Sequence, residues 1–571
     1  MIDLNLGRLG FADCGLYSTT LAYAARDVVT YLGSTYRCTL ATTAGQDPAG
    51  FPTHWVLMAR GTAGVYTNKG DLLTSDGADV LRLPIGSAGH VLGVKDGIPT
   101  WTPPVSRQGT MAAALAYNPN GTSVSFGGLP VIMTDGAIKM WGGSSNLCAG
   151  DATNNHVINP QPVAFDPLNS PAFPMVQVAT CFTSNYALDS AGRVYAWGYN
   201  AYGQLGQGDT TNRAVATQIT WFAQQNIPIA EIIVPREGGN SVAAGCVFFR
   251  STDGRVFGCG YNVCGQLGNG TLTNSSLPVR CGTIASIAKV FASAQDYTSV
   301  FAIDSAGKLY AWGRNGHGQL GLGDVVDRST PTQVPNIVNA KKVCATAGVQ
   351  GTVYTGDTAV LCTDGSLYVT GCNAHGALGL GDIIQRNVFS KLNTSTFTPA
   401  DMELFGGYCD SLWVIDTVGK LWACGNNAYG QLGLGDLISR TTLTQVGGGQ
   451  PFDGKVARLK AGGNQNSSGQ SVFAVLQDTT GKLWATGYNL SGQLAVGDVT
   501  SRTSFSRVTG PRATEHMGIV DYTMGGYGTL GRLWVLTSDG RVWGAGDNTS
   551  FSLGTQNTVA RNEYRLSDVI F

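Results

Sequence analysis

One stretch of this 571-residue chain has the spacing of a dinucleotide-binding loop. Residues 316–321 spell GHGQLG, and glycines spaced in this way let a backbone approach a pyrophosphate. Such a loop needs a strand before it and a helix after it. Residues 308–312 (KLYAW) favour a strand, but residues 320–324 (LGLGD) add glycine and Pro331 follows. Within a helix glycine costs about 1 kcal/mol and proline about 3 kcal/mol relative to alanine, so a helix and a bound nucleotide are not predicted.

The other reactive residue types show no catalytic or metal-binding spacing. Glycosidases need two carboxylates about 5–10 Å apart, whereas the acids here fall in recurring turns, as do Asp304, Asp416 and Asp539. The six histidines are scattered without H-x-x-x-H spacing, and no G-x-S-x-G elbow is present. The thirteen cysteines form no C-x-x-C pair and are expected to be free, buried thiols. We predict no catalytic residue, metal site or cofactor, although a triad assembled only in space stays open.

The glycine-rich stretch is one of eight copies of a repeated phrase. Other complete copies end at Asp209, Thr271, Asp382, Asp436 and Asp498, and two shorter copies flank them. In these copies Gly316 is replaced by Ala, Val or Leu, so the dinucleotide spacing is accidental. A fixed period of this size predicts a propeller or solenoid. The glycine that ends the strand before each phrase recurs every 53–62 residues, at Gly142, Gly198, Gly260, Gly313, Gly371, Gly425, Gly487 and Gly546.

Each repeat is predicted to be a small antiparallel sheet of three or four strands. Two alternating apolar runs flank a turn such as DSAGK, which is a hairpin signal. One blade cannot bury both of its faces alone, so neighbouring blades must stack around an axis. We expect the phrase leucine to pack between blades (Leu205, Leu267, Leu320, Leu378, Leu432, Leu494, Leu553). An Asp and an Arg four residues later are expected to brace the loop in five repeats (Asp209/Arg213, Asp324/Arg328, Asp382/Arg386, Asp436/Arg440, Asp498/Arg502).

The phrase resembles the repeat of the regulator of chromosome condensation family, strand-W-G-x-N-x-x-G-Q-L-G-x-G. The resemblance covers about residues 110 to 571 and implies an all-β fold, a propeller of seven or eight blades preceded by small β modules. That family usually has seven blades, whereas eight phrases are counted here. The last residues, Ser567 to Phe571, look like the first strand of a further unit, and we expect them to pair with the first repeat and close the ring.

The front of the chain lacks the phrase. Residues 1–62 resemble a small chitin-binding-like module, which predicts two short strands, a polar loop and a strand with a tryptophan. The aromatic residues of such modules stack on sugars in some members; the alternative is that they form the core of a very small domain, and virion attachment is the role predicted for this module. The positions that carry the resemblance are Asp27, Val29, Tyr31, Gly33, Tyr36, Pro52 and Trp55.

Residues 63–108 resemble the linking segment of many bacteriophage tail fibres. The elements GDLL, RLPIG and GxPxW carry this resemblance. It implies a segment between a virion-attached end and a displayed tip, and a fibre that assembles as a homotrimer. Residues 101–104 (WTPP) would form a stiff spacer before the propeller of residues 109–571.

Composition narrows the function classes. Glycine accounts for 79 residues, charged residues for 13%, and the formal net charge is −1. A nucleic-acid-binding protein usually carries an excess of Lys and Arg, so no nucleic-acid partner is predicted. The chain has no run of 18 apolar residues, and its first residues lack the pattern of a secretory signal. We therefore expect no membrane insertion and synthesis in a bacterial cytoplasm.

Three functions are compatible with these observations. The leading hypothesis is a virion structural protein in the phage tail, a tail fibre or receptor-binding protein that contacts other tail or baseplate proteins and adsorbs to a host cell-surface glycan or protein. The alternative, implied by the propeller resemblance, is a regulatory propeller that binds a protein, as exchange factors and inhibitors of that family do. A polysaccharide-cleaving enzyme is the third hypothesis, which the dispersed acids disfavour.

Receptor contacts are expected in the least repetitive stretches, because shared positions build the blades. These stretches are Ser144–Pro174, Thr220–Asn240, Ala345–Asp357 and Gly462–Ser471. Within them Trp221 and Phe222 are the candidate receptor-binding residues.

Overall fold

A computed structural model gives the fold of the chain. Contacts divide it into two units, Met1–Thr110 and Met111–Phe571, and each is described by itself. Of the first unit the structure describes chiefly the backbone of its strands. The second unit is described at residues 129–142, 150–151, 157–171, 173–181, 183–235, 245–293, 298–346, 356–405, 410–463, 472–509, 518–527, 530–548 and 553, and as backbone in the remaining strands named below.

The first unit contains a four-stranded sheet and two hairpins. In the sheet β1 (Ala12–Leu16) runs parallel to β2 (Asp27–Tyr31), and antiparallel pairing continues through β3 (Ser34–Cys38) to β4 (Trp55–Ala59). The side chains proposed above to carry sugar or virion binding lie outside the described residues, so those roles stay predictions. The hairpins are β5 (Leu72–Ser75) with β6 (Val80–Leu83), and β7 (Val91–Lys95) with β8 (Ile98–Thr102).

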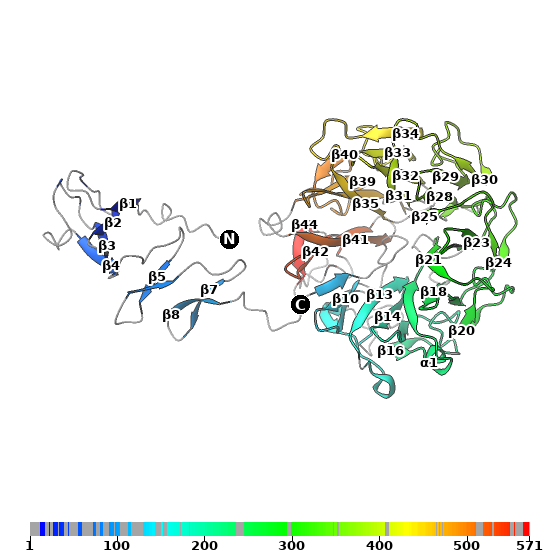
Figure 1. The fold of residues 1–571 in the computed structure, drawn as a ribbon, viewed down its shortest axis with the longest axis horizontal. Helices are drawn as coiled ribbons and strands as arrows, with labels where there is room; N and C mark the ends of the chain where they lie inside the picture. The colour runs from blue at the N-terminus through cyan, green and yellow to red at the C-terminus, as the bar shows by residue number, and fades with distance from the viewer. Residues whose placement is uncertain are drawn as a thin grey trace. The chain divides into compact units, whose positions relative to one another are not determined.

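The second unit is a β-propeller of eight blades, which decides between the seven and eight blades that the sequence left open. Figure 1 shows the blades following one another around a ring, with the fourth strands β16, β20, β24, β30 and β34 at its outer edge. Every blade is a meander of four antiparallel strands. Blades 1 to 4 are β9 (Ala112–Leu115), β10 (Leu129–Met133), β11 (Ile138–Gly142), β12 (Val157–Pro162); β13 (Met175–Cys181), β14 (Ser184–Asp189), β15 (Val194–Gly198), β16 (Arg213–Gln218); β17 (Ile229–Ile233), β18 (Cys246–Ser251), β19 (Val256–Gly260), β20 (Ser275–Arg280); and β21 (Ile287–Ala292), β22 (Ser299–Asp304), β23 (Leu309–Gly313), β24 (Arg328–Gln333).

Blades 5 to 8 continue the same plan, and blades 5 and 7 each insert a short hairpin between their first two strands. These blades are β25 (Ala340–Ala345), β28 (Asp357–Cys362), β29 (Leu367–Gly371), β30 (Arg386–Lys391); β31 (Pro399–Phe405), β32 (Ser411–Asp416), β33 (Leu421–Gly425), β34 (Arg440–Val446); β35 (Val456–Gly462), β38 (Phe473–Asp478), β39 (Leu483–Gly487), β40 (Arg502–Arg507); and β41 (Ile519–Tyr527), β42 (Leu530–Thr537), β43 (Val542–Gly546), β44 (Glu563–Val569). The inserted hairpins are β26 (Gly348–Gln350) with β27 (Val353–Thr355), and β36 (Gln465–Asn466) with β37 (Gly469–Gln470).

The core lies between the blades. The second strands, such as β14 and β32, are buried along their whole length because each face packs against a neighbouring blade. The phrase leucines confirm the sequence prediction: all seven are at most 1% exposed. All nine described cysteines are free, and eight of them are buried. Burying these apolar side chains between sheets supplies the main stabilisation of the ring.

The glycine that ends each third strand is required by a close backbone approach. Gly198 has a φ of 101°, and a Cβ atom there would lie 2.1 Å from the carbonyl oxygen of Thr183. That oxygen accepts a hydrogen bond from the N–H of Tyr199, so it cannot move away without losing the bond. The equivalent glycines of the other described blades have the same positive φ. Only glycine adopts this conformation without strain.

The ring closes differently from the prediction made for its C-terminus. Strand β44 pairs antiparallel with β43, as in Val542↔Val569, and is therefore the fourth strand of blade 8. The expected pairing of Ser567–Phe571 with the first repeat is wrong, because blade 1 already has four strands of its own. Blades 8 and 1 instead meet through a side-chain cluster that includes Trp141, Val157 and Trp534. Figure 1 shows these first and last blades side by side.

Replacing Gly198 by alanine should destabilise the propeller strongly. The left-handed backbone and the clash with Thr183 together should cost about 2–4 kcal/mol, measured as a lower melting temperature. Gly448 is the matched control, because it is exposed and an added Cβ would meet nothing within 4 Å. Gly448→Ala should change stability by no more than about 0.5 kcal/mol. Equal melting temperatures for the two variants would refute this account of the glycine.

Candidate functional site

The meander topology gives the propeller two distinct faces. In each blade the connections between strands one and two and between strands three and four leave the same edge of the sheet. We call this side the phrase-loop face, because the repeated phrase forms the three-to-four connection. The opposite side, the tight-turn face, carries the turns between strands two and three and the connections from blade to blade.

A buried asparagine organises the phrase loop in each of blades 2 to 7. In blade 6 Asn427 accepts a hydrogen bond from the N–H of Leu432 at 3.0 Å and donates one to the carbonyl of Asp436 at 2.9 Å. Asn427 is 0% exposed, so these bonds satisfy groups that water does not reach. Asn200, Asn262, Asn315, Asn373 and Asn489 make the same contacts in their own loops. The asparagine thus sets the loop that presents the residues beyond it.

The predicted Asp–Arg braces are confirmed in five blades, with nitrogen–oxygen distances of 2.6–2.7 Å. In blade 6 the other oxygen of Asp436 accepts the N–H of Ile438 at 2.9 Å, and Arg440 donates to the carbonyl of Ile438. The Arg440 guanidinium and this N–H lower the pKa of Asp436 below its usual value. The backbone at the tip of the loop is therefore held from both sides.

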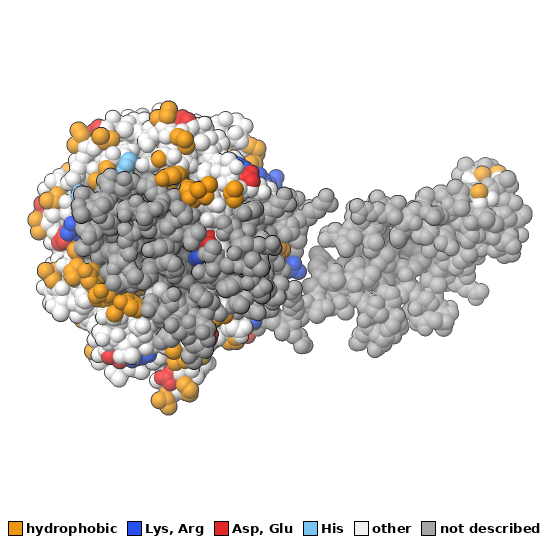
Figure 2. Space-filling model, turned by 180° about the vertical axis from the view of Figure 1, so that it is seen from behind, with side chains coloured by type: hydrophobic (Ala, Val, Ile, Leu, Met, Phe, Trp, Pro, Cys, Tyr) orange, Lys and Arg blue, Asp and Glu red, His pale blue; other side chains and the backbone are white. Residues whose placement is uncertain are grey.

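The tips that these braces hold are apolar in three consecutive blades. We call the six residues at them the apolar arc. Their side chains are between 47% and 66% exposed: Val325 and Val326 in blade 4, Ile383 and Ile384 in blade 5, Leu437 and Ile438 in blade 6. Blade 3 has Leu272–Thr273 and blade 7 has Val499–Thr500 at the same positions, while blade 2 has Thr210–Thr211. Hydrophobic side chains also appear on one face of the propeller as separate clusters near its rim (Figure 2).

Two of the stretches selected from the sequence reach this same face. The hairpin β26–β27 lies within Ala345–Asp357, and β36–β37 lies within Gly462–Ser471. Their strands β26 and β36 are in contact although they belong to blades 5 and 7. Both hairpins are described as backbone only. Both hairpins therefore stand on the same face as the apolar arc and contact each other there.

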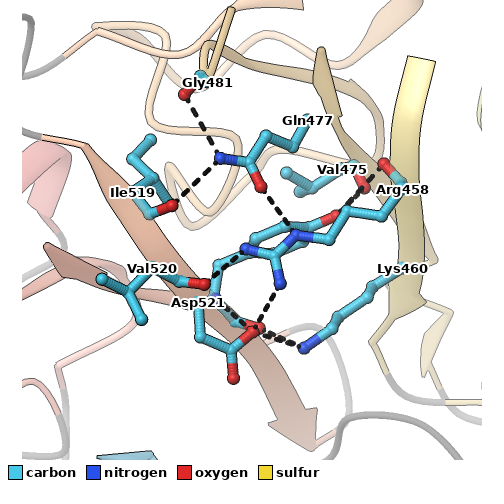
Figure 3. Close-up of polar contacts among 9 residues, drawn as sticks. Arg458, Lys460, Val475, Gln477, Gly481, Ile519, Val520 and Asp521 are labelled. Carbon is cyan, nitrogen blue, oxygen red and sulfur yellow. Dashed lines mark hydrogen bonds and ion pairs between the residues drawn. The ribbon is translucent and has the colours of Figure 1, made fainter. Parts of the chain in front are cut away.

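Charged side chains on the first strands of blades 7 and 8 form a network of ion pairs. Figure 3 shows Arg458 and Lys460 of β35 directed at Asp521 of β41. Their nitrogens lie 3.1 Å and 2.9 Å from the same carboxylate oxygen. The two cations also lie 4.8 Å and 5.1 Å from the centre of the Tyr522 ring. Because each charge is engaged between blades 7 and 8, the network ties the blades together and offers no free base for catalysis.

One pair of carboxyl groups is in contact, and substrate cannot reach it. Asp357 and Asp410 are 0% and 1% exposed. A glycosidase needs its two carboxylates on opposite sides of a bound sugar, so this pair does not serve as one. Among the residues that the structure describes, no group of three or more His, Cys, Asp or Glu side chains could hold a metal ion. No helix in that part of the chain is long and apolar enough to cross a membrane.

The structure places the two named receptor candidates away from the phrase-loop face. Trp221 and Phe222 lie on α1 (Thr220–Gln224), which connects blades 2 and 3 on the tight-turn face. Phe222 is 2% exposed and packs against Phe249 at 5.0 Å between ring centres. It is a core residue, which corrects its selection as a surface contact; its apolar character signals packing. Trp221 is partly buried on the same cluster, and a contact with a receptor stays a prediction for it.

The remaining selected stretch, Ser144–Pro174, is described only in part. Its described residues include β12 and η3 (Pro167–Asn169), with Leu168, which at 89% is the most exposed large apolar residue in the described part of the chain. Sequence reasoning did not single out the apolar arc, because it lies inside the repeat. The available signal was the alternation between Thr–Thr and aliphatic pairs at one position of the phrase.

Comparisons with known proteins agree with this architecture. Residues 191–233, 253–298 and 306–354 match the model described as "Regulator of chromosome condensation (RCC1) repeat". These three segments are similar to repeats of the RCC1 type. The chain is 27% identical to the ultraviolet-B receptor UVR8 of Arabidopsis thaliana over 419 residues, covering 72% of this chain and 85% of that one.

Two further matches are more restricted. The probable E3 ubiquitin-protein ligase HERC4 of Homo sapiens is 30% identical over 162 residues, which are 28% of this chain but 14% of HERC4. The crystal structure of human WBSCR16 superposes with a TM-score of 0.50 at 18% identity, covering 69% of this chain and 97% of that one. At this identity the superposition supports the fold alone. None of these matches supports the tail-fibre interpretation.

The asparagine should matter more to stability than the ion pair in the same loop. Asn427→Ala leaves the buried N–H of Leu432 without its acceptor and should cost about 1–3 kcal/mol. Arg440→Ala removes a surface brace and should cost about 0–1 kcal/mol. Thermal melts of the two variants at neutral pH measure the difference.

The pH dependence of the stability of Arg440→Ala checks the ion pair between Asp436 and Arg440. The pKa of Asp436 is lower in the folded chain, so the brace stabilises above the unfolded pKa of about 3.9 and is lost as pH falls through the folded value. The gap between wild type and Arg440→Ala should therefore shrink in acid. A gap that grows below pH about 4 would contradict the assigned brace.

Proposed function

We propose that this propeller is a protein-binding module and that the apolar arc is its docking surface. One observation carries the proposal. Blade 2 makes the same asparagine contacts and the same Asp–Arg brace with Thr210–Thr211 at the tip. The loop therefore folds with polar residues, and aliphatic side chains at blades 4 to 6 are not needed to build it. Large apolar groups held in water on a braced backbone are typical of interaction sites.

The chemistry of the arc favours a protein partner. Its residues are aliphatic, whereas sugar-binding surfaces rely on aromatic rings. The nearby charges cancel, since each arginine is engaged by an aspartate of its own loop. A nucleic acid would need unpaired cations. Because the backbone at each tip is held by Asp, Arg and Asn side chains, docking loses little conformational freedom, which favours affinity.

The comparisons are consistent with a binding role. The names of the similar proteins describe a receptor and a ligase, so RCC1-type repeats occur in proteins of different activity. A scaffold of this kind supplies surfaces, and its specificity lies in the exposed loops. Regulation of a bound protein is the function that we assign to the propeller on this basis.

The tail-fibre role remains a separate proposal about the first unit. It rests on residues 63–108, where the structure describes two hairpins as backbone. A homotrimeric fibre, contacts with tail or baseplate proteins and a place in the virion all depend on it. The binding experiment described next distinguishes the two roles. A protein partner that the arc variant binds more weakly supports docking, and retention of whole bacteria or envelope glycan supports adsorption.

Replacing four residues of the arc by the threonines that blade 2 uses should weaken docking without unfolding the protein. The variant carries Ile383→Thr, Ile384→Thr, Leu437→Thr and Ile438→Thr, and its melting temperature should stay within about 2 °C of wild type, as for surface changes. Partners retained by the immobilised wild type from extracts of the source organism should bind at least about tenfold more weakly. Direct titration of each purified partner measures the change.

The matched control lies on the tight-turn face. Val338 and Val418 are 68% and 64% exposed, and Val338→Thr with Val418→Thr should leave every interaction intact. Equal binding of a purified partner by the arc variant and the wild type would overturn the proposal. Retention of whole bacteria or envelope glycan by both the wild type and the arc variant would instead support adsorption to a host cell surface as the function.

A further inference from the structure

Two buried carboxyl groups meet where blades 5 and 6 join on the phrase-loop face. Asp357 begins β28, and Asp410 immediately precedes β32. The side chains lie within hydrogen-bonding reach of each other. One oxygen of each, Asp357 Oδ2 and Asp410 Oδ1, is buried and receives no bond from an N–H or O–H group of the described residues. A proton held between the two carboxyls would give both oxygens a partner.

Among the residues that the structure describes, no cation lies where it could neutralise the pair. Asp357 Oδ1 accepts the N–H of Asn373 at 2.9 Å, and the hydroxyl of Thr346 reaches Asp410. The other titratable groups of the described residues that face the pair are the thiols of Cys372 and Cys424. Burial raises the pKa of Cys372 to about 12 and also raises that of Cys424, so both stay neutral. In the same phrase loop burial lowers the pKa of His375, which disfavours a positive charge on its ring.

The pair stands where this propeller departs from its own repeat. In other blades the phrase glutamine packs against the residue before the second strand of the next blade, as Gln204 does at Gly245 and Gln319 at Gly356. In blade 5 the phrase reads GALG, so Ala377 replaces the glutamine. The residue of the next blade at this position is Asp410. A carboxyl group therefore stands at a junction where those blades have a neutral amide.

The same residues form the root of an inserted hairpin. The N–H of Thr346 donates to the carbonyl of Asp357 at 2.8 Å, and the N–H of Asp357 donates to Thr346 Oγ1 at 3.0 Å. These two residues bracket β26–β27, the hairpin that contacts β36 of blade 7. A change of charge at Asp357 therefore acts directly on the base of this hairpin.

We propose that Asp357 and Asp410 share one proton and that this proton locks the root of the β26–β27 hairpin to blade 6. With the proton in place the two blades are joined by a carboxyl–carboxylate hydrogen bond. When it leaves, two negative charges remain buried together without a counter-ion, and the root of the hairpin loosens. The inference stands on the packing of this junction and does not depend on the apolar arc.

The direction of the pH effect follows from the two acids. Burial raises the pKa of Asp357 to about 6, and burial with the neighbouring carboxyl raises the pKa of Asp410 well above its usual value. Because both values are higher in the folded chain than the unfolded value of about 3.9, the contribution to stability is full below about pH 4 and is lost as pH rises through about 6 and beyond.

Asp410→Asn tests the shared proton, because an amide donates a permanent hydrogen bond to Asp357. Between pH 5 and pH 8 the melting temperature of the wild type should fall by about 3 °C more than that of the variant. Hydrogen exchange in residues 346–357, corrected for its intrinsic pH dependence, should speed up over the same range in the wild type only. Asp324→Asn is the control, since Asp324 is paired with Arg328 and should leave the slope unchanged.

Further measurements keep the test decisive. If Asp410→Asn fails to fold, the pair Asp410→Thr with Ala377→Gln restores the pattern of the other blades and should also flatten the slope. In the wild type, infrared spectra should show a protonated carboxyl that titrates near neutrality. Parallel slopes for wild type and variant, or no such carboxyl signal, would overturn the proposal. So would a rise in the melting temperature with added Ca²⁺ at pH 8 that Asp410→Asn lacks, because a cation would then fill the site.

Discussion

The whole propeller depends on one backbone approach that is repeated in the blades. The carbonyl that precedes the second strand accepts the N–H of the residue after the third-strand glycine, as Thr183 does for Tyr199. A side chain at Gly198 would occupy the place of that oxygen. The bond ends the third strand at a fixed residue and turns the chain into the phrase loop. The asparagine, leucine and brace that follow are positioned by this turn, which explains why the glycine recurs at every third strand.

Within each repeat, the residues that stabilise the blade are therefore different from the residues that vary between blades. Asn427, Leu432 and the carboxylate of Asp436 satisfy backbone groups or fill the space between sheets, so they recur from blade to blade. The side chains of the two residues after each braced aspartate point outward and take part in none of these contacts. They vary from threonine to isoleucine on an unchanged backbone. A repeat of this kind can change its surface without altering its stability much, which is why we look for function at those two positions.

The sequence was sufficient to predict the architecture, because the determining residues recur at the same positions in most of the repeats. The strand glycine, the phrase leucine and the Asp–Arg spacing each lie within one repeat, so their roles follow from the pattern. The closure of the ring could not be derived in this way. The segment around Ser567 resembles a first strand, and its pairing with β43 depends on blade 1 already being complete. Phe222 was misjudged for a similar reason: its position in a non-repeated stretch hid the packing partners that other blades supply.

At the junction of blades 5 and 6 two residues depart from the repeat, and together they indicate a property that the repeated residues do not have. Ala377 removes a glutamine, and Asp410, 33 residues further along the chain, supplies a carboxyl to the vacated junction beside Asp357. Neither change is informative alone, since alanine and aspartate are common in loops. Together they replace a neutral contact with a titratable one at the foot of an inserted hairpin. An acid pair kept out of water at such a junction stabilises the ring less than an amide would at neutral pH. Its presence is therefore better explained by a response to protonation than by stability.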